Sequence, residues 1–161
     1  MRFSLLPAAL VLFPLVLFSQ SPLDKVRAWR MQHEDRIIRQ EFLPFLSIPN
    51  VATDTVNILR NTVFLLDLMH AKGIRATRLL EAGEGVPPVV YGEVAVPGAS
   101  RTIIFYAHYD GQPVNPAQWA KELDPFQPKL FSNAIDKGGV NRPFPADGNY
   151  NPEWRIYARS A

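Results

Sequence analysis

The 161-residue chain contains no cysteine. This excludes disulfides, thiolate metal sites, a cysteine nucleophile and an acylated lipoprotein anchor. Any metal ion would have to be held by histidine, aspartate and glutamate side chains.

A strong excess of charge is also missing. The chain has 17 Lys and Arg against 15 Asp and Glu, a formal net charge of +2. It has no run of basic residues and no interleaving of basic with aromatic residues, which argues against a nucleic-acid or anionic-membrane partner bound by bulk electrostatics. The sequence also lacks a Gly-x-Ser-x-Gly nucleophile elbow and a phosphate-binding glycine loop, so serine-triad hydrolysis and nucleotide chemistry have no support.

The first nineteen residues have the pattern of a secretory signal peptide. Arg2 supplies a positive charge, residues 5–18 are apolar, and Ser19 is a small residue at the end of the run. The apolar run is shorter than the ~20 residues of a membrane-spanning helix. We expect residues 1–19 to be a signal peptide, with an uncleaved N-terminal anchor as the alternative. Residues 20–161 would then be secreted or periplasmic.

Hydrophobic periodicity predicts two helices followed by three strands. The first helix ends near Pro44, and the second begins after Thr53 or Asp54 and ends before Gly73. On the second helix, Val56, Leu59, Val63, Leu66 and His70 form one apolar stripe. Residues 132–153, rich in Gly, Pro and Asn, should form a long excursion before a short strand. The expected helices are 24–45 and 54–72, and the expected strands are 74–80, 89–96, 102–107 and 154–158.

The stretch 102–113 is the most informative part of the sequence. An apolar run, Thr102 to Ala107, ends in His108-Tyr109-Asp110. Such a run is typical of a strand buried on both faces in the middle of a parallel sheet. Open α/β sheets place their ligand chemistry at the carboxyl ends of such strands.

His108 and Asp110 are two residues apart and project to the same side of an extended backbone. The carboxylate can accept the imidazole Nδ1 proton, which fixes the tautomer and leaves Nε2 for a metal. This is one metal ligand, and a zinc site takes at least three protein ligands. The spacing by itself also fits a strand-end histidine that is merely satisfied by a neighbouring carboxylate.

Four motifs, in order along the chain, resemble the M20 family of zinc-dependent metallopeptidases, most closely its dipeptidase-like branch with the carnosine dipeptidases. They are Pro88–Glu93, Ile104–Val114, Trp119 with Asp124–Pro128, and Ile156–Ala161. The resemblance implies an α/β fold with a mixed sheet flanked by helices. It implies that His108 is a zinc ligand and that Asp110 is the catalytic aspartate that orients it. It further implies two zinc ions per complete site, peptide or dipeptide substrates, and a homodimer of the full-length protein.

The chain departs from the family pattern in three places. Ala107 stands where many members have Gly, and Gly111 where many have Val. Residues 132–153 are longer than the usual link, which indicates an insertion. In the family, a bridging aspartate and a Glu-Glu pair follow the segment that ends at Ala161. We therefore expect residues 20–161 to be the N-terminal part of a catalytic domain, inactive alone, without its C-terminal part and dimerisation domain.

Two other functions stay open on the sequence. One is an N-acyl amino acid amidohydrolase of the same family, which cleaves a related amide bond at the same kind of metal site. The other is a catalytically dead secreted binding module. Neither involves nucleic acid, nor a membrane beyond the signal sequence.

Overall fold

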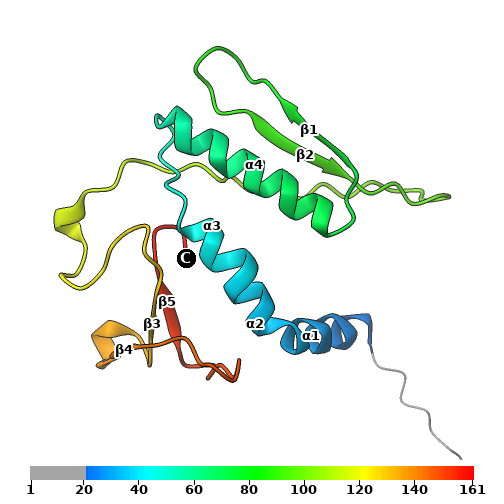
Figure 1. Ribbon diagram of the computed structural model, residues 1–161. Helices are drawn as coiled ribbons and strands as arrows, with labels where there is room; N and C mark the ends of the chain where they lie inside the picture. The colour runs from blue at the N-terminus through cyan, green and yellow to red at the C-terminus, as the bar shows by residue number, and fades with distance from the viewer. Residues whose placement is uncertain (1–20) are drawn as a thin grey trace, which may run out of the picture. The chain divides into compact units, whose positions relative to one another are not determined.

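The computed structural model describes residues 21–161 (Figure 1). The predicted signal peptide, residues 1–19, lies outside the described residues. The chain divides into two units, Met1–His33 and Glu34–Ala161, and each is described by itself. In the described part, no helix combines the length and apolar character needed to cross a membrane.

The described part of the first unit is helix α1, Pro22–Gln32. Ser21 caps it by accepting a hydrogen bond from the Asp24 amide at 3.1 Å, and Pro22 occupies the first turn, where no amide is needed. The helix ends at His33, whose ring stacks on Trp29 at 4.3 Å between centroids. Nδ1 of His33 lies 2.7 Å from the Trp29 carbonyl oxygen, so this histidine is engaged at its own helix end.

The second unit begins with a helical stretch that the sequence predicted only in part. It consists of α2 (Glu34–Arg36), a π-helical segment (Ile37–Phe42) and α3 (Leu43–Leu46). The predicted uninterrupted helix over 24–45 is wrong. The Leu43 amide bonds to the Ile38 carbonyl five residues back. Pro44 follows. Because proline has no amide hydrogen and disfavours a regular α-helix in the turn before it, the wider π-helical turn lies just before Pro44.

Helix α4, Thr55–Ala71, confirms the second predicted helix. Asp54 is its cap and accepts a hydrogen bond from the Asn57 amide at 3.1 Å. Gly73, at φ +82°, follows its end, and this conformation favours glycine.

The predicted apolar stripe on α4 is not the buried face. Val56 and Val63 are 71% and 57% exposed, whereas Ile58 and Asn61 are 2% and 1% exposed. The helix is apolar on more than one side, so periodicity alone does not select the stripe that packs. Which face of α4 becomes buried depends on the segments that pack against the helix.

Within residues 21–161, the strands form two small antiparallel sheets. β1 (Ala76–Leu80) pairs with β2 (Val89–Glu93) in a hairpin that contacts α4. The other sheet has the order β4-β3-β5, formed by Asn141–Arg142, Lys129–Phe131 and Arg155–Tyr157. Short 3-10 helices, η2 and η3, span Pro116–Gln118 and Ile135–Lys137. The strands predicted at 74–80, 89–96 and 154–158 are thus confirmed, with shorter bounds.

The combination of helices and strands agrees with the coarse α/β prediction. The predicted strand at 102–107 is wrong for the described residues: no sheet includes it, and residues 101–110 are irregular. A central strand is stabilised by hydrogen bonds to neighbours on either side, which its own sequence cannot supply. Residues 21–161 provide no such neighbours, so the mixed sheet with a buried parallel strand is absent from them.

The predicted excursion 132–153 is partly structured and is tied to the start of the second unit. It contains η3 and β4. Arg39 donates to the Pro145 carbonyl at 2.7 Å, and the Tyr150 hydroxyl donates to Asp35 at 2.9 Å. These bonds give this Gly- and Pro-rich segment a defined attachment to α2 and the π-helical turn.

Candidate functional site

Backbone pairing at Gly111 positions the His108–Asp110 stretch. The Gly111 amide donates to the Asn50 carbonyl at 2.7 Å, and the Ala52 amide donates to the Gly111 carbonyl at 2.9 Å. The two segments run parallel at this point. The end of the predicted strand is therefore anchored beside the turn that leads into α4.

His108 makes its main contact with the backbone of Asp110. Nδ1 of the ring lies 2.7 Å from the Asp110 carbonyl oxygen and 3.5 Å from the carboxylate oxygen Oδ1. A carbonyl oxygen only accepts hydrogen bonds, so Nδ1 carries the proton. The neutral ring then has its lone pair on Nε2, and the His108 side chain is 72% exposed. The sequence predicted the contact between His108 and Asp110. It expected the Asp110 carboxylate to fix the tautomer, whereas in the structure the Asp110 backbone carbonyl does so.

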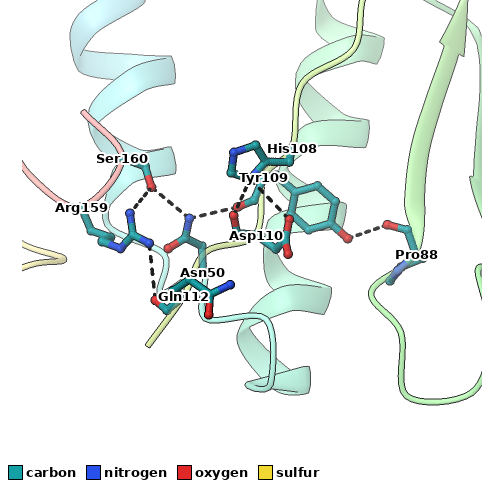
Figure 2. A network of polar contacts seen from close by, with 8 residues as sticks. All are labelled: Asn50, Pro88, His108, Tyr109, Asp110, Gln112, Arg159 and Ser160. Atoms are coloured by element: carbon teal, nitrogen blue, oxygen red, sulfur yellow. Dashed lines mark hydrogen bonds and ion pairs between the residues drawn. The ribbon is translucent and has the colours of Figure 1, made fainter. Parts of the chain in front are cut away.

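Asn50 holds the neighbouring residue Tyr109 in place. Its Nδ2 donates to the Tyr109 carbonyl at 3.0 Å and to Ser160 Oγ at 3.1 Å (Figure 2). Asn50 is only 9% exposed. Its Oδ1 has no hydrogen-bond partner within residues 21–161, so the amide is fixed by its donor side alone.

The Tyr109 side chain attaches the same stretch to the hairpin. Its hydroxyl donates to the Pro88 carbonyl at 2.5 Å, immediately before β2 (Figure 2). Burial, and to a lesser degree the nearby Asp110 carboxylate, raise the pKa of the Tyr109 hydroxyl. The hydroxyl therefore stays a neutral donor throughout the physiological range.

Residues near the C-terminal end lie against the other side of this stretch. The Arg159 amide donates to the Pro125 carbonyl at 2.6 Å, and Nη2 donates weakly to the Gln112 carbonyl at 3.4 Å. A Cβ atom on Gly111 would lie only 2.7 Å from Nη2. Glycine at this position lets the Arg159 guanidinium approach the backbone, and Ser160, at φ +68°, follows in a strained conformation.

These contacts assemble three segments that are distant in sequence: residues 50–52, 108–112 and 159–160. Sequence reasoning identified His108 and Asp110 but missed Asn50, Arg159 and Ser160 as neighbours. Pro49-Asn50 has the pattern of a loop before a helix. No local pattern marks the Asn50 side chain as a partner of Tyr109 or Ser160, which are 59 and 110 positions further along the chain.

The described residues supply too few ligands for a complete zinc site. Within residues 21–161, no group of three or more His, Cys, Asp or Glu side chains is placed to hold a metal ion. Residues 1–20 contain none of these residue types. His70 Nε2 is 2.7 Å from Thr77 Oγ1, at the other end of α4 from Asn50. His108 with Asp110 therefore fits one ligand and its orienting partner, fewer than the three ligands that zinc takes.

A separate hollow of about 260 Å³ lies on the β1–β2 hairpin. Its lining includes Arg78, Tyr91 and Glu93 but neither His108 nor Asp110. Because it holds no histidine, we do not assign the metal chemistry to it.

No family model, no curated protein and no solved structure matches the chain.

Proposed function

We propose that the chain supplies part of the metal site of a zinc-dependent hydrolase that cleaves peptide bonds in dipeptides or short peptides. His108 is the metal ligand and Asp110 is the residue that orients it. The observation that carries the proposal is the Nδ1 contact of His108 with the Asp110 carbonyl, which leaves an exposed Nε2 free to bind metal. The motif resemblance supplies the reaction and substrate class.

Zinc, when bound, lowers the pKa of its water to about 7 and polarises the scissile carbonyl. The residues of this chain hold and orient the imidazole. Asp110 fixes its tautomer through the backbone carbonyl at 2.7 Å, and its carboxylate lies 3.5 Å from the same nitrogen. Asn50 and the pairing at Gly111 fix the backbone on which both side chains stand.

A single imidazole does not bind zinc tightly, because structural and catalytic sites combine three or four protein ligands. The proposal therefore assigns no turnover to the 161-residue chain alone. It also places the protein outside the cytoplasm, on the pattern of residues 1–19.

The test is a zinc titration of the chain followed by NMR of the histidine ring protons. We expect zinc to perturb His108 ahead of His33 and His70, because His108 offers an exposed Nε2. His108→Ala should remove this first event, and the matched variant His70→Ala should leave it unchanged. Preferential binding at His70, or zinc binding that survives in His108→Ala, would refute the assignment. Tight stoichiometric binding with hydrolysis of dipeptides would refute the claim that one ligand is too few.

A further inference from the structure

The hollow of about 260 Å³ on the β1–β2 hairpin has a polar lining that the proposed zinc site does not use. Two arginines and one glutamate supply its charges, and a threonine and a tyrosine complete it: Arg75, Arg78, Glu93, Thr77 and Tyr91. Two guanidinium groups against one carboxylate leave an excess of positive charge in the hollow. This excess favours an anionic ligand.

The guanidinium of Arg78 is held by stacking. Arg78 and Tyr91 are direct partners in the strand register, and the guanidinium carbon lies 4.8 Å from the centre of the tyrosine ring. Stacking on an aromatic ring uses the flat face of the guanidinium, whereas its N–H donors lie in the plane of the group. Arg78 is therefore held in position with its donors available to a ligand.

The carboxylate of Glu93 is engaged by Tyr91. The Tyr91 hydroxyl donates to Glu93 Oε2 at 3.0 Å, and this hydrogen bond is the main cause that raises the pKa of Tyr91. In the described part of the chain, neither Arg75 nor Arg78 has a carboxylate oxygen within 4 Å. Both guanidinium groups thus line the hollow without a counter-ion from residues 21–161.

Helix α4 fixes the strands that carry these side chains. His70 Nε2 lies 2.7 Å from Thr77 Oγ1, which joins the end of α4 to β1. On β2, a Cβ atom on Gly92 would lie only 2.8 Å from Met69 Sδ, so the strand packs closely on the helix at this point. A hollow built on strands that are already fixed loses less conformational entropy when a ligand binds.

The charge of the lining selects the class of ligand. An apolar group over the hollow would take two guanidinium groups out of water without partners, which is costly. A carboxylate or phosphate group instead matches the planar set of donors that each guanidinium presents. We propose that the hollow on the β1–β2 hairpin binds a small oxyanion, a carboxylate or a phosphate group, between Arg75 and Arg78.

Glu93 sets the position of the anion within the hollow. Its carboxylate repels a second negative charge, so the oxyanion lies towards the two arginines and away from Glu93. The inference does not depend on the proposed zinc chemistry, because the lining contains neither His108 nor Asp110.

The first measurement is an NMR titration of the 161-residue chain with inorganic phosphate and, separately, with succinate, at constant ionic strength. The backbone amides of β1 and β2 should shift and then saturate. The anion with the lower dissociation constant shows whether the hollow prefers a phosphate or a carboxylate.

The second measurement repeats the titration with charge variants. Arg75→Gln and Arg78→Gln should each weaken binding about tenfold, because each removes charge-assisted hydrogen bonds. Arg78→Lys keeps the charge but loses the planar donors, and should weaken binding less. Glu93→Gln should strengthen binding, since it removes the repulsion. The matched control Arg101→Gln removes the same charge from an exposed residue outside the lining and should leave binding unchanged.

Three results would overturn the proposal. The first is the absence of a saturable shift at β1 and β2 with both anions. The second is an equal loss in Arg101→Gln and the two lining variants, which would show a response to net charge alone. The third is weaker binding in Glu93→Gln. The zinc titration at His108 should be the same in Arg75→Gln as in the wild type, so the two proposals can fail separately.

Discussion

The side-chain amide of Asn50 holds the backbone of Tyr109, 59 residues away, through a 3.0 Å hydrogen bond from Nδ2 to the Tyr109 carbonyl oxygen. The same nitrogen donates to Ser160 Oγ at 3.1 Å. One buried side chain thus fixes the stretch that carries His108 and Asp110 and the segment near the C-terminal end.

Asn50→Ala should destabilise the protein by about 1–3 kcal/mol, because it leaves the Tyr109 carbonyl without its donor. Urea unfolding measures the change. Asn149→Ala is the matched control: Asn149 is exposed and, within residues 21–161, bonds only to nearby Asp147, so its removal should cost no more than about 0.5 kcal/mol. Equal losses in the two variants would show that the Asn50 amide has no special role.

The buried face of α4 makes a second prediction. Ile58→Ala should lower the free energy of unfolding by about 2–5 kcal/mol, because the side chain is 2% exposed and its loss leaves a cavity. Val56→Ala lies on the same helix at 71% exposure and should change it by less than about 0.5 kcal/mol. Denaturant unfolding of both variants tests which face of α4 is buried. If the apolar stripe expected from periodicity were the buried face, Val56→Ala would cost more free energy of unfolding than Ile58→Ala.

The tautomer of His108 can be observed directly by its ring ¹⁵N chemical shifts. In the neutral ring the proton should reside on Nδ1, since the Asp110 carbonyl oxygen at 2.7 Å can only accept. Asp110→Asn should keep this tautomer, because the backbone carbonyl of residue 110 remains. Asp110→Pro, in contrast, changes the backbone that presents this carbonyl to the ring. If Asp110→Asn moves the proton to Nε2, the carboxylate and not the carbonyl fixes the ring.

Alkaline pH should weaken the attachment of the 145–150 segment. Burial and, next, the hydrogen bond to Asp35 raise the pKa of Tyr150 from 10.0 to about 12. A raised pKa means that the folded state holds the proton more tightly, so this stabilisation is present below pH 10 and is lost as the pH rises towards 12. The free energy of unfolding, measured by urea between pH 9 and 12, should therefore fall more steeply in the wild type than in Tyr150→Phe.

A pair of carboxylate variants separates the causes of this shift. Asp35→Asn removes the charge that accepts the Tyr150 hydroxyl at 2.9 Å and should lower the pKa of Tyr150, read from tyrosinate absorbance. Asp147→Asn removes a carboxylate from the same segment that does not bond to Tyr150, and the Tyr150 titration should stay as in the wild type. A shift of equal size in both would contradict a specific role for Asp35.

Much of the local structure could be predicted from sequence. Asp54 as the cap of α4, Gly73 at its end and the hairpin strands follow from contacts within a few residues, which the local sequence encodes. The His108 contact with Asp110 has the same origin, since the partners are two residues apart.

Two of the wrong predictions, the buried face of α4 and the strand at 102–107, depend on distant partners. Periodicity gave α4 an apolar stripe, but the buried face is the one that holds Asn61, whose amide donates to the Pro49 carbonyl at 2.8 Å. The strand expected at 102–107 has the right composition, yet its pairing depends on neighbours that the described residues do not supply.

The sequence by itself therefore determined the local elements and the placement of His108 two residues before Asp110, because turns, caps and short-range hydrogen bonds are set by neighbouring residues. Tertiary structure alone decided that Asn50, Tyr109 and Ser160 meet, that Gly111 gives room to Arg159, and that residues 102–107 stay exposed. These outcomes depend on hydrogen bonds and close approach between segments up to 110 residues apart, for which the sequence carries no periodic signal.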